Sequence, residues 1–227
     1  MAEKRAGVKK VSRPIAKFNE HLSDEQREVK KQMFDIDIAI FNGKAGTGKT
    51  SLAVNYAYEQ FVTKGNDVDK IYITRATVCR KKDNLGFLSG DMFEKMNPWM
   101  QPIYDSLYRL EPPTANRDKV KELIGEKKLE IVPLAFVQGR TFTNSIVIID
   151  EYQNLDDTDA EGLFTRLGVG SKMIFCGDDR QSLITGNCVK KLNLAAKEIN
   201  RMGSFTFTRN FRHPLVKELI EFYEKML

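Results

Sequence analysis

The sequence predicts a three-layer α/β fold in which one parallel β-sheet carries helices on both faces. Short apolar segments typical of buried strands alternate along the chain with longer segments of helical periodicity. The stretch GKAGTGKT at residues 43–50 fits the pattern G-x-x-x-x-G-K-[ST] and lies between a predicted strand and a predicted helix. With 227 residues, of which 41% are hydrophobic, the chain can form one such core. Together these observations predict a single P-loop NTPase domain.

Strands and helices are expected to alternate from residue 36 to the end of the chain. The six predicted strands lie at 36–41, 71–74, 129–133, 145–149, 172–176 and 205–208. Helices are expected from 49 to about 62, once or twice within 92–124, and near 157–166, 189–200 and 214–226. In the last helix, apolar residues recur at Leu215, Leu219, Phe222 and Met226, which indicates a face packed against the core.

The net charge of +5 is concentrated at the amino end. Residues 1–20 hold six basic residues against Glu3 and Glu20, a local excess of four positive charges, so the remainder is nearly neutral. A basic segment without apolar periodicity is typical of a solvated arm that attracts phosphates non-specifically. We therefore expect a flexible basic arm at 1–20 and one ATPase domain at 21–227.

The cysteines and the hydropathy pattern restrict the environment of the protein. Cys79, Cys176 and Cys188 are too far apart for a CxxC pair, which favours reduced thiols over a disulfide framework or a zinc site. No apolar run approaches the roughly 20 residues needed to cross a membrane, and the first ten residues lack the apolar stretch of a secretory signal. We expect a cytoplasmic protein without a membrane partner.

The glycine-rich stretch carries the chemistry of phosphate binding. Gly46 and Gly48 allow the backbone amides to turn inward around phosphates, and the helix that begins near Lys49 directs its positive end at them. Lys49 is expected to neutralise the β- and γ-phosphates, and the Thr50 hydroxyl to coordinate Mg²⁺. The predicted nucleotide-binding residues are Gly43, Lys44, Ala45, Gly46, Thr47, Gly48, Lys49, Thr50 and Ser51.

Two adjacent acids end the strand SIVIID and indicate the type of reaction. Asp150 is expected to hold the magnesium shell, and Glu151 to polarise a water molecule for attack on the γ-phosphate. A small-molecule kinase needs no such base, so this pair favours a hydrolase. The segments at 71 and 129 lie between the P-loop strand and this acidic strand in the sequence, which leaves room for an inserted strand, as in the RecA-like branch of these folds.

Two glutamines are further candidates at the same edge of the sheet. The stretch FCGDDRQS places Asp178 and Gln181 after another predicted strand, where Gln181 could sense the γ-phosphate or orient the attacking water. Gln26 lies at a predicted helix start upstream of the P-loop, and its amide could pair with the N6 and N7 edge of adenine. By itself, however, Gln26 also fits an ordinary exposed helical residue.

The order of these motifs resembles the first half of a superfamily 1 helicase. From about residue 21 onward, the chain is more closely similar to the PhoH family of ATPases. The matching stretches are LGFLSGDMFEKMNPWMQPIYDSL (85–107), PLAFVQGRTF (133–142), IIDEYQN (148–154), TRLGVGSKM (165–173) and FRHPLV (211–216). The resemblance implies a RecA-like ATPase core, a hexameric ring and a role in acting on RNA. The chain departs from the family in TRATVCRKKDN, which lacks the usual proline after TR, and in Tyr152, where a small residue is usual.

The chain contains one such lobe, whereas a monomeric helicase closes two lobes on one ATP and takes an arginine from the second. Arg212 in NFRHP resembles the helicase arginine that touches the γ-phosphate, and it could act on its own ATP or on that of a neighbour. We expect the site to be completed across a subunit interface of a head-to-tail ring.

Candidates for nucleic-acid contact are basic residues near strand ends. Arg75 occupies the position of a helicase motif that grips the strand backbone, and Arg80, Lys81, Lys82 and Arg140 are further candidates, with Trp99 available for stacking on bases. Four of these residues have a plainer explanation: Lys81 and Lys82 fit a solvated face, Arg140 an ion pair with an acid, and Trp99 a core position. His213 fits a helix-start residue before Pro214, and His21 a solvated one.

The sequence thus predicts a Mg²⁺-dependent ATP hydrolase with Lys49, Glu151, Gln181 and Arg212 as catalytic residues and Thr50 and Asp150 as metal ligands. One interpretation couples hydrolysis to single-stranded RNA or DNA in a ring-forming motor. The alternative is a slow nucleotide-dependent switch or scaffold that acts on a protein partner. Stimulation of turnover by single strands distinguishes the two.

Overall fold

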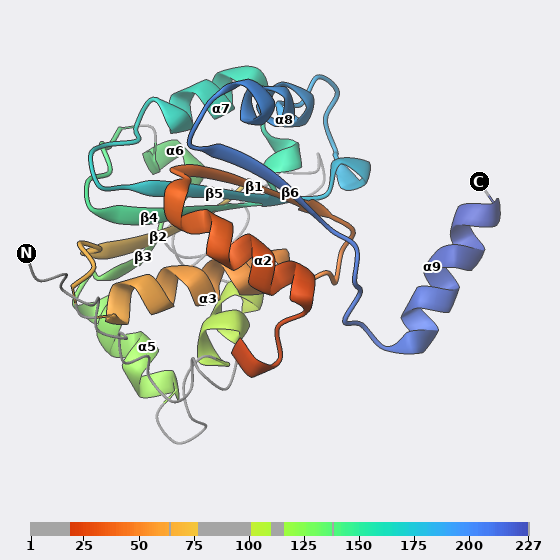
Figure 1. The fold of residues 1–227 in the computed structure, drawn as a ribbon, viewed down its shortest axis with the longest axis horizontal. Coiled ribbons are helices and arrows are strands. Elements are labelled where there is room, and N and C mark those ends of the chain that lie inside the picture. The colour runs from red at the N-terminus through yellow and green to blue at the C-terminus, as the bar shows by residue number, and fades with distance from the viewer. Residues whose placement is uncertain (1–18, 64, 77–100, 110–115, 138, 227) are drawn as a thin grey trace, which may run out of the picture.

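The computed structural model describes residues 19–63, 65–76, 101–109, 116–137 and 139–226, and these form a six-stranded parallel sheet between two helical layers (Figure 1). The strands are β1 (Ile38–Gly43), β2 (Lys70–Arg75), β3 (Leu129–Ile131), β4 (Ser145–Asp150), β5 (Lys172–Gly177) and β6 (Met202–Phe207). Their order is β3-β2-β4-β5-β1-β6, and every neighbouring pair is parallel. The fold class and all six predicted strands are confirmed.

The helices divide between the two faces of the sheet. One face carries α2 (Asp24–Gln32), α3 (Lys49–Val62) and α5 (Asn116–Gly125), and the other α6 (Leu134–Val137), α7 (Asp157–Phe164) and α8 (Val189–Glu198) (Figure 1). Within the described residues, short 3-10 helices lie between helices and strands at η1 (Met33–Asp35), η3 (Tyr152–Asn154) and η4 (Asp179–Gln181). Strand residues alternate between two buried clusters, one under each layer: Ile146 and Ile148 face α3 and α5, whereas Val147 and Ile149 face α7 and α8.

A strand does lie between the P-loop strand and the acidic strand, but it is not one of the two expected. The inserted strand is β5, which pairs with β1 on one side and β4 on the other. The segments at 71 and 129 form β2 and β3, which lie beyond β4 towards the sheet edge. The prediction failed because order along the chain does not fix order in a parallel sheet, where each crossover can run in either direction.

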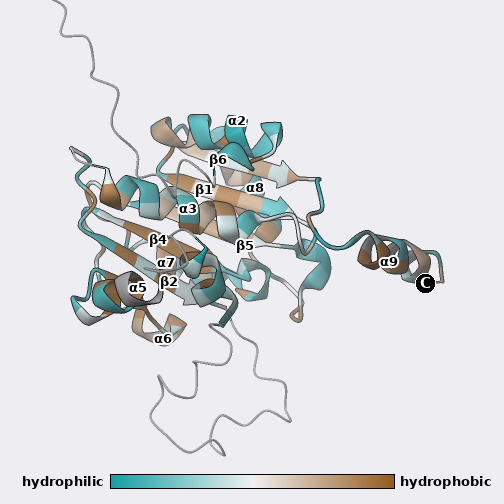
Figure 2. Cartoon of the chain, turned by 90° about the horizontal axis from the view of Figure 1, so that it is seen from below, coloured by the Kyte–Doolittle hydropathy of each residue, from teal (hydrophilic) through white to brown (hydrophobic). Residues whose placement is uncertain are grey.

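The prediction that the last helix packs its apolar face against the core is wrong. Helix α9 (Pro214–Met226) stands apart from the body of the domain in both views (Figure 1, Figure 2). The side chains of Leu215, Leu219, Phe222, Tyr223 and Met226 are between 48% and 74% exposed. Helical periodicity identifies an apolar face but not what covers it. Neither α9 nor any other helix in the described ranges is long and apolar enough to cross a membrane.

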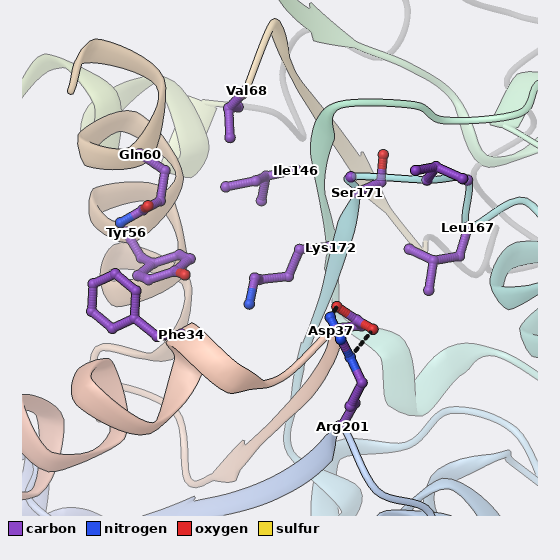
Figure 3. A pocket seen from close by; sticks show the side chains of 13 residues that line it. Phe34, Asp37, Tyr56, Gln60, Val68, Ile146, Leu167, Ser171, Lys172 and Arg201 are labelled. Carbon is purple, nitrogen blue, oxygen red and sulfur yellow. Dashed lines mark hydrogen bonds and ion pairs between the residues drawn. The ribbon is translucent and has the colours of Figure 1, made fainter. Parts of the chain in front are cut away.

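A cavity of ≈ 560 Å³ opens at the amino edge of the sheet, away from the P-loop (Figure 3). Lys172 at the start of β5 lies in its wall and donates to the backbone carbonyls of Met33 and Ile36. On another side, the guanidinium of Arg201 binds both carboxylate oxygens of Asp37, with both distances at 2.6 Å. These polar groups are engaged with the protein itself, so we assign the cavity a structural role.

The half-buried amine of Lys172 makes the stability of the domain depend on pH. Burial lowers the pKa of Lys172 to about 8. In the unfolded chain the Lys172 amine keeps its proton until about pH 10.5. Between pH 8 and 10.5 the unfolded state therefore binds more protons than the folded state, and the free energy of unfolding rises with pH. The difference in the free energy of unfolding between the native protein and Lys172→Met is expected to shift in favour of the native protein from pH 8 to 10. Urea titrations at pH 7, 8, 9 and 10 measure this; a constant difference would contradict it.

Candidate nucleotide site

The P-loop joins β1 to α3 at the carboxyl edge of the sheet. Gly46 and Gly48 have φ angles of 88° and 79°, a region that favours glycine, and α3 begins directly after them at Lys49. A Cβ on Gly46 would lie 2.7 Å from Cγ of Arg212, so a larger residue would not fit there. The loop therefore directs the amino end of a 14-residue helix at the space above the sheet, as phosphate binding requires.

Lys49 lies in the mouth of this loop. Its ammonium donates to the carbonyl oxygens of Gly43 at 2.6 Å and Lys44 at 3.0 Å. Burial lowers its pKa, while the nearby carboxyls of Asp178, Glu151 and Asp150 oppose that shift. The ammonium is thus held by exchangeable carbonyl contacts at the place where the motif puts phosphate oxygens.

Thr50 and Asp150 meet as expected of two members of one magnesium shell. The Thr50 hydroxyl donates to Oδ1 of Asp150 at 2.7 Å across the gap between α3 and β4. Burial raises the pKa of Asp150, and the Arg75 charge and the Thr50 hydrogen bond counteract this. Mg²⁺ is commonly bound through one or two protein oxygens, with phosphates and waters as its other ligands. The two side chains fit that donor set.

Glu151 follows directly in a left-handed backbone conformation, with φ 57° and ψ 36°. Such a conformation is uncommon for a residue other than glycine and often marks a functional site. Its carboxylate accepts from the guanidinium of Arg75 at 3.1 Å and from the side-chain amide of Gln153 at 2.6 Å. The base predicted from sequence is therefore held on both of its oxygens.

The structure places Arg75 in the candidate nucleotide site, whereas the sequence predicts a contact with a nucleic-acid backbone. Arg75 is the last residue of β2 and is in register with Asp150 on β4. Besides its contact with Glu151, its Nε lies 3.7 Å from Oδ2 of Asp150. The Arg75 side chain contacts two acids and is 21% exposed, so it is poorly placed to bind the backbone of a nucleic acid.

One cavity of ≈ 550 Å³ brings most of the predicted residues together. Its volume is typical of a small-molecule site. Predicted residues in its wall are Ala45, Gly46, Gly48, Lys49, Thr50, Ser51, Asp150, Glu151, Gln181 and Arg212; Arg75 and Asp178 line it as well. Four loops that follow β1, β4, β5 and β6 meet here, as the carboxyl ends of parallel strands do. Of the predicted P-loop residues, Gly43, Lys44 and Thr47 are not part of this wall.

Arg212 reaches the P-loop of its own chain. The backbone amide of Phe211 donates to the carbonyl of Gly46 at 2.9 Å, which fixes the segment after β6 against the loop. The carboxamide oxygen of Asn210 accepts from the Arg212 amide at 2.8 Å. The sequence left open whether Arg212 acts on its own ATP or on that of a neighbour; the geometry favours its own.

Gln26 is buried against the P-loop, so its interpretation as an exposed helical residue is wrong. It takes part in a capping box at the start of α2, where its side chain accepts from the Ser23 amide and its own amide donates to the Ser23 hydroxyl. Its carboxamide also donates to the carbonyl of Thr47 at 3.3 Å. These contacts place Gln26 beside the site, and its proposed contact with adenine stays a prediction.

The other nucleic-acid candidates gain little from the structure. Arg140 pairs with Glu130 at 2.8 Å and lies over the ring of Tyr72. Arg80, Lys81, Lys82 and Trp99 lie outside the described residues. His213 accepts from the Leu215 amide at 3.3 Å, which confirms its role at a helix start, and His21 is exposed, as expected.

Gln153 is a site residue that the sequence analysis missed. Its side chain is 1% exposed, and it contacts Glu151 through its amide nitrogen and the Asp178 amide through its oxygen. Its position two residues after the predicted base Glu151 was the available signal, but a glutamine there has no role in the general P-loop pattern. Tyr152, the departure from the family, is buried away from the acids and donates to Asn42 at 2.5 Å.

The chain is similar to known proteins in sequence and in fold. A PhoH-like protein of Synechocystis sp. is 36% identical over 205 residues, which cover 88% of this chain and 60% of that protein; one of Bacillus subtilis is 38% identical, with 88% and 62% covered. The chain thus spans less than two thirds of the length of these relatives. The solved structure of the large terminase from a thermophilic bacteriophage is 14% identical, covers 88% of this chain and 49% of its own, and has a TM-score of 0.50, a likeness in fold alone. The family model described as PhoH-like protein matches residues 20–224, and the chain belongs to this family.

Proposed function

We propose that this domain is a cytoplasmic, Mg²⁺-dependent ATP hydrolase that works as the motor of a homo-oligomer, a hexameric ring, on single-stranded RNA or DNA. The observation that carries the hydrolase is the meeting of Lys49, the Thr50–Asp150 pair and Glu151 around one cavity. A kinase would need an acceptor site in place of a base, whereas the second acid here lies in the cavity wall, where a water molecule can be activated.

The residues divide the reaction between them. Lys49 and Arg212 are cations in the cavity wall and would stabilise the charge that develops on the transferred phosphoryl group. Glu151 would accept a proton from water as the water oxygen attacks the γ-phosphorus and the bond to the bridging oxygen of ADP breaks. Gln181 would orient that water. A bound Mg²⁺ would supply neutralisation of the phosphate oxygens.

The exposed face of α9 supports the homo-oligomer. An apolar surface of five large side chains on a helix that stands away from the domain is typical of a protein–protein contact. α9 begins at Pro214, close to Arg212, so a subunit that binds near the start of this helix would also lie next to the nucleotide site. Assembly would thereby affect the rate of hydrolysis.

Leu219→Glu is expected to abolish self-association, because a charge on the apolar face would be buried in the contact. Sedimentation velocity measures the outcome, with thermal unfolding as a check that the domain stays folded; no loss of stability is expected because Leu219 is exposed in the single chain. Lys225→Glu places the same residue on an exposed polar position of α9 and serves as the control. Assembly of Leu219→Glu equal to that of the control would contradict the role of α9.

The ion pairs of Arg75 and Arg140 favour the second candidate function, a nucleotide-dependent switch that acts on a protein partner. Of the basic candidates for nucleic-acid contact, the two that lie in the described part of the chain are both engaged with acids of the domain. The switch predicts slow turnover that single strands leave unchanged, whereas the motor predicts stimulation.

A further inference from the structure

The side chain of Gln153 connects two parts of the nucleotide site that are distant in sequence. It belongs to η3, directly after the acids, and its amide nitrogen donates to Oε2 of Glu151 at 2.6 Å. Its oxygen accepts from the backbone amide of Asp178 at 3.1 Å, at the start of the loop that carries Gln181. One amide thus contacts both the proposed base and the proposed γ-phosphate sensor loop.

The surroundings of Gln153 fix this orientation. The side chain is buried, and Gly177 leaves room for it, because a Cβ on Gly177 would lie 2.4 Å from Oε1 of Gln153. The Ser182 hydroxyl donates to the Gln153 carbonyl at 2.9 Å, so the backbone of Gln153 also binds the sensor loop. A buried amide with both ends hydrogen-bonded has one stable arrangement, since any rotation leaves polar groups unpaired.

We propose that Gln153 is a positioning residue for hydrolysis. It orients the Glu151 carboxylate and connects it to the loop that carries Asp178 and Gln181. When this loop shifts on contact with the γ-phosphate, Gln153 moves the base with it. Arg75 holds the other oxygen of Glu151 from β2. Glu151 therefore lies between a fixed strand and a loop that senses the nucleotide. This inference rests on the proposed role of Glu151 as the base.

Gln153→Glu tests the proposal with little change in shape. It keeps an acceptor for the Asp178 amide, and it replaces the donor to Glu151 with a second carboxylate that repels the first. We expect kcat for ATP to fall about 100-fold, as for a misplaced catalytic group. The Kd for a fluorescent ATP analogue should stay unchanged, because Gln153 is absent from the cavity wall. Unchanged kcat would overturn the proposal.

Asn154→Ala is the matched control. The side chain of Asn154 also joins the two loops, through a hydrogen bond from the Leu183 amide at 3.0 Å, but it binds neither carboxylate. The backbone amide of Asn154 donates to the Glu151 carbonyl at 3.0 Å, and the alanine variant keeps this bond. This variant should retain kcat. An equal loss in Asn154→Ala would show that general rigidity of the loops matters and not the aim of Glu151, and would overturn the proposal.

A double-mutant cycle shows whether Gln153 acts through Glu151. In the Glu151→Gln background, Gln153→Glu should cause no further loss of single-turnover rate, because the base is already absent; an additive loss would overturn the proposal. The same double variant exchanges donor and acceptor, so it should recover part of the stability that Gln153→Glu loses in urea unfolding without nucleotide. The stability measurement remains informative if the native protein turns over no ATP, a result that would contradict only the proposed function. If the two substitutions showed no coupling in urea unfolding, the contact between Gln153 and Glu151 itself would be contradicted.

Discussion

Lys49→Ala is expected to abolish tight binding of ATP. The ammonium lies in the mouth of the P-loop, held by the carbonyls of Gly43 and Lys44, and is the cation that the motif supplies to the β- and γ-phosphates. Loss of charged hydrogen bonds worth about 3 kcal/mol weakens affinity about 100-fold. Titration with a fluorescent ATP analogue measures the change.

Lys44→Ala is a suitable control for that variant. Lys44 belongs to the same predicted nucleotide-binding loop, but it contacts the site through its backbone carbonyl, which alanine keeps, and it is not part of the cavity wall. Its affinity for ATP should remain near that of the native protein. Equal losses in both variants would mean that the loop responds to any change of charge, and the specific role of Lys49 would fall.

Glu151→Gln should bind ATP normally and fail to turn it over. The substitution removes the basic carboxylate but keeps the size of the side chain and an oxygen that accepts from Arg75. Removal of a general base lowers kcat by about 10²–10⁴-fold. Binding should persist because the phosphates are held by the P-loop and Lys49. Titration and single-turnover rates on the same preparation separate the two steps.

The two variants together assign separate roles to the two residues. Lys49→Ala should fail first in binding and Glu151→Gln in chemistry alone. If both lost affinity and rate to the same extent, the division between a binding lysine and a catalytic base would be refuted, whatever the absolute size of the defects.

The chemistry of the site could be predicted from sequence because its motifs are local. The P-loop needs its glycines and Lys49 at fixed spacing, and Asp150 and Glu151 end a strand whose carboxyl edge meets that loop in any open parallel sheet. Thr50 and Asp150 are 100 residues apart and still meet as the pattern predicts.

What the sequence could not supply were contacts set by tertiary neighbours. Arg75 was predicted to contact a nucleic acid because the sequence around a basic residue at the end of a β-strand does not identify its partner. Only the pairing of β2 with β4 places Arg75 beside both acids. The burial of Gln26 and the exposure of α9 have the same origin. Periodicity indicates how one element is patterned, whereas packing decides which surface it meets.

The most direct test of the proposed function is ATP turnover per subunit, measured with and without single-stranded RNA and DNA over a range of protein concentration that spans assembly. The account predicts that turnover rises both with assembly and with added strand, that strand stimulation weakens as salt increases, and that Leu219→Glu loses the dependence on concentration. Turnover that is the same at every concentration and with every strand would contradict the motor and leave the switch.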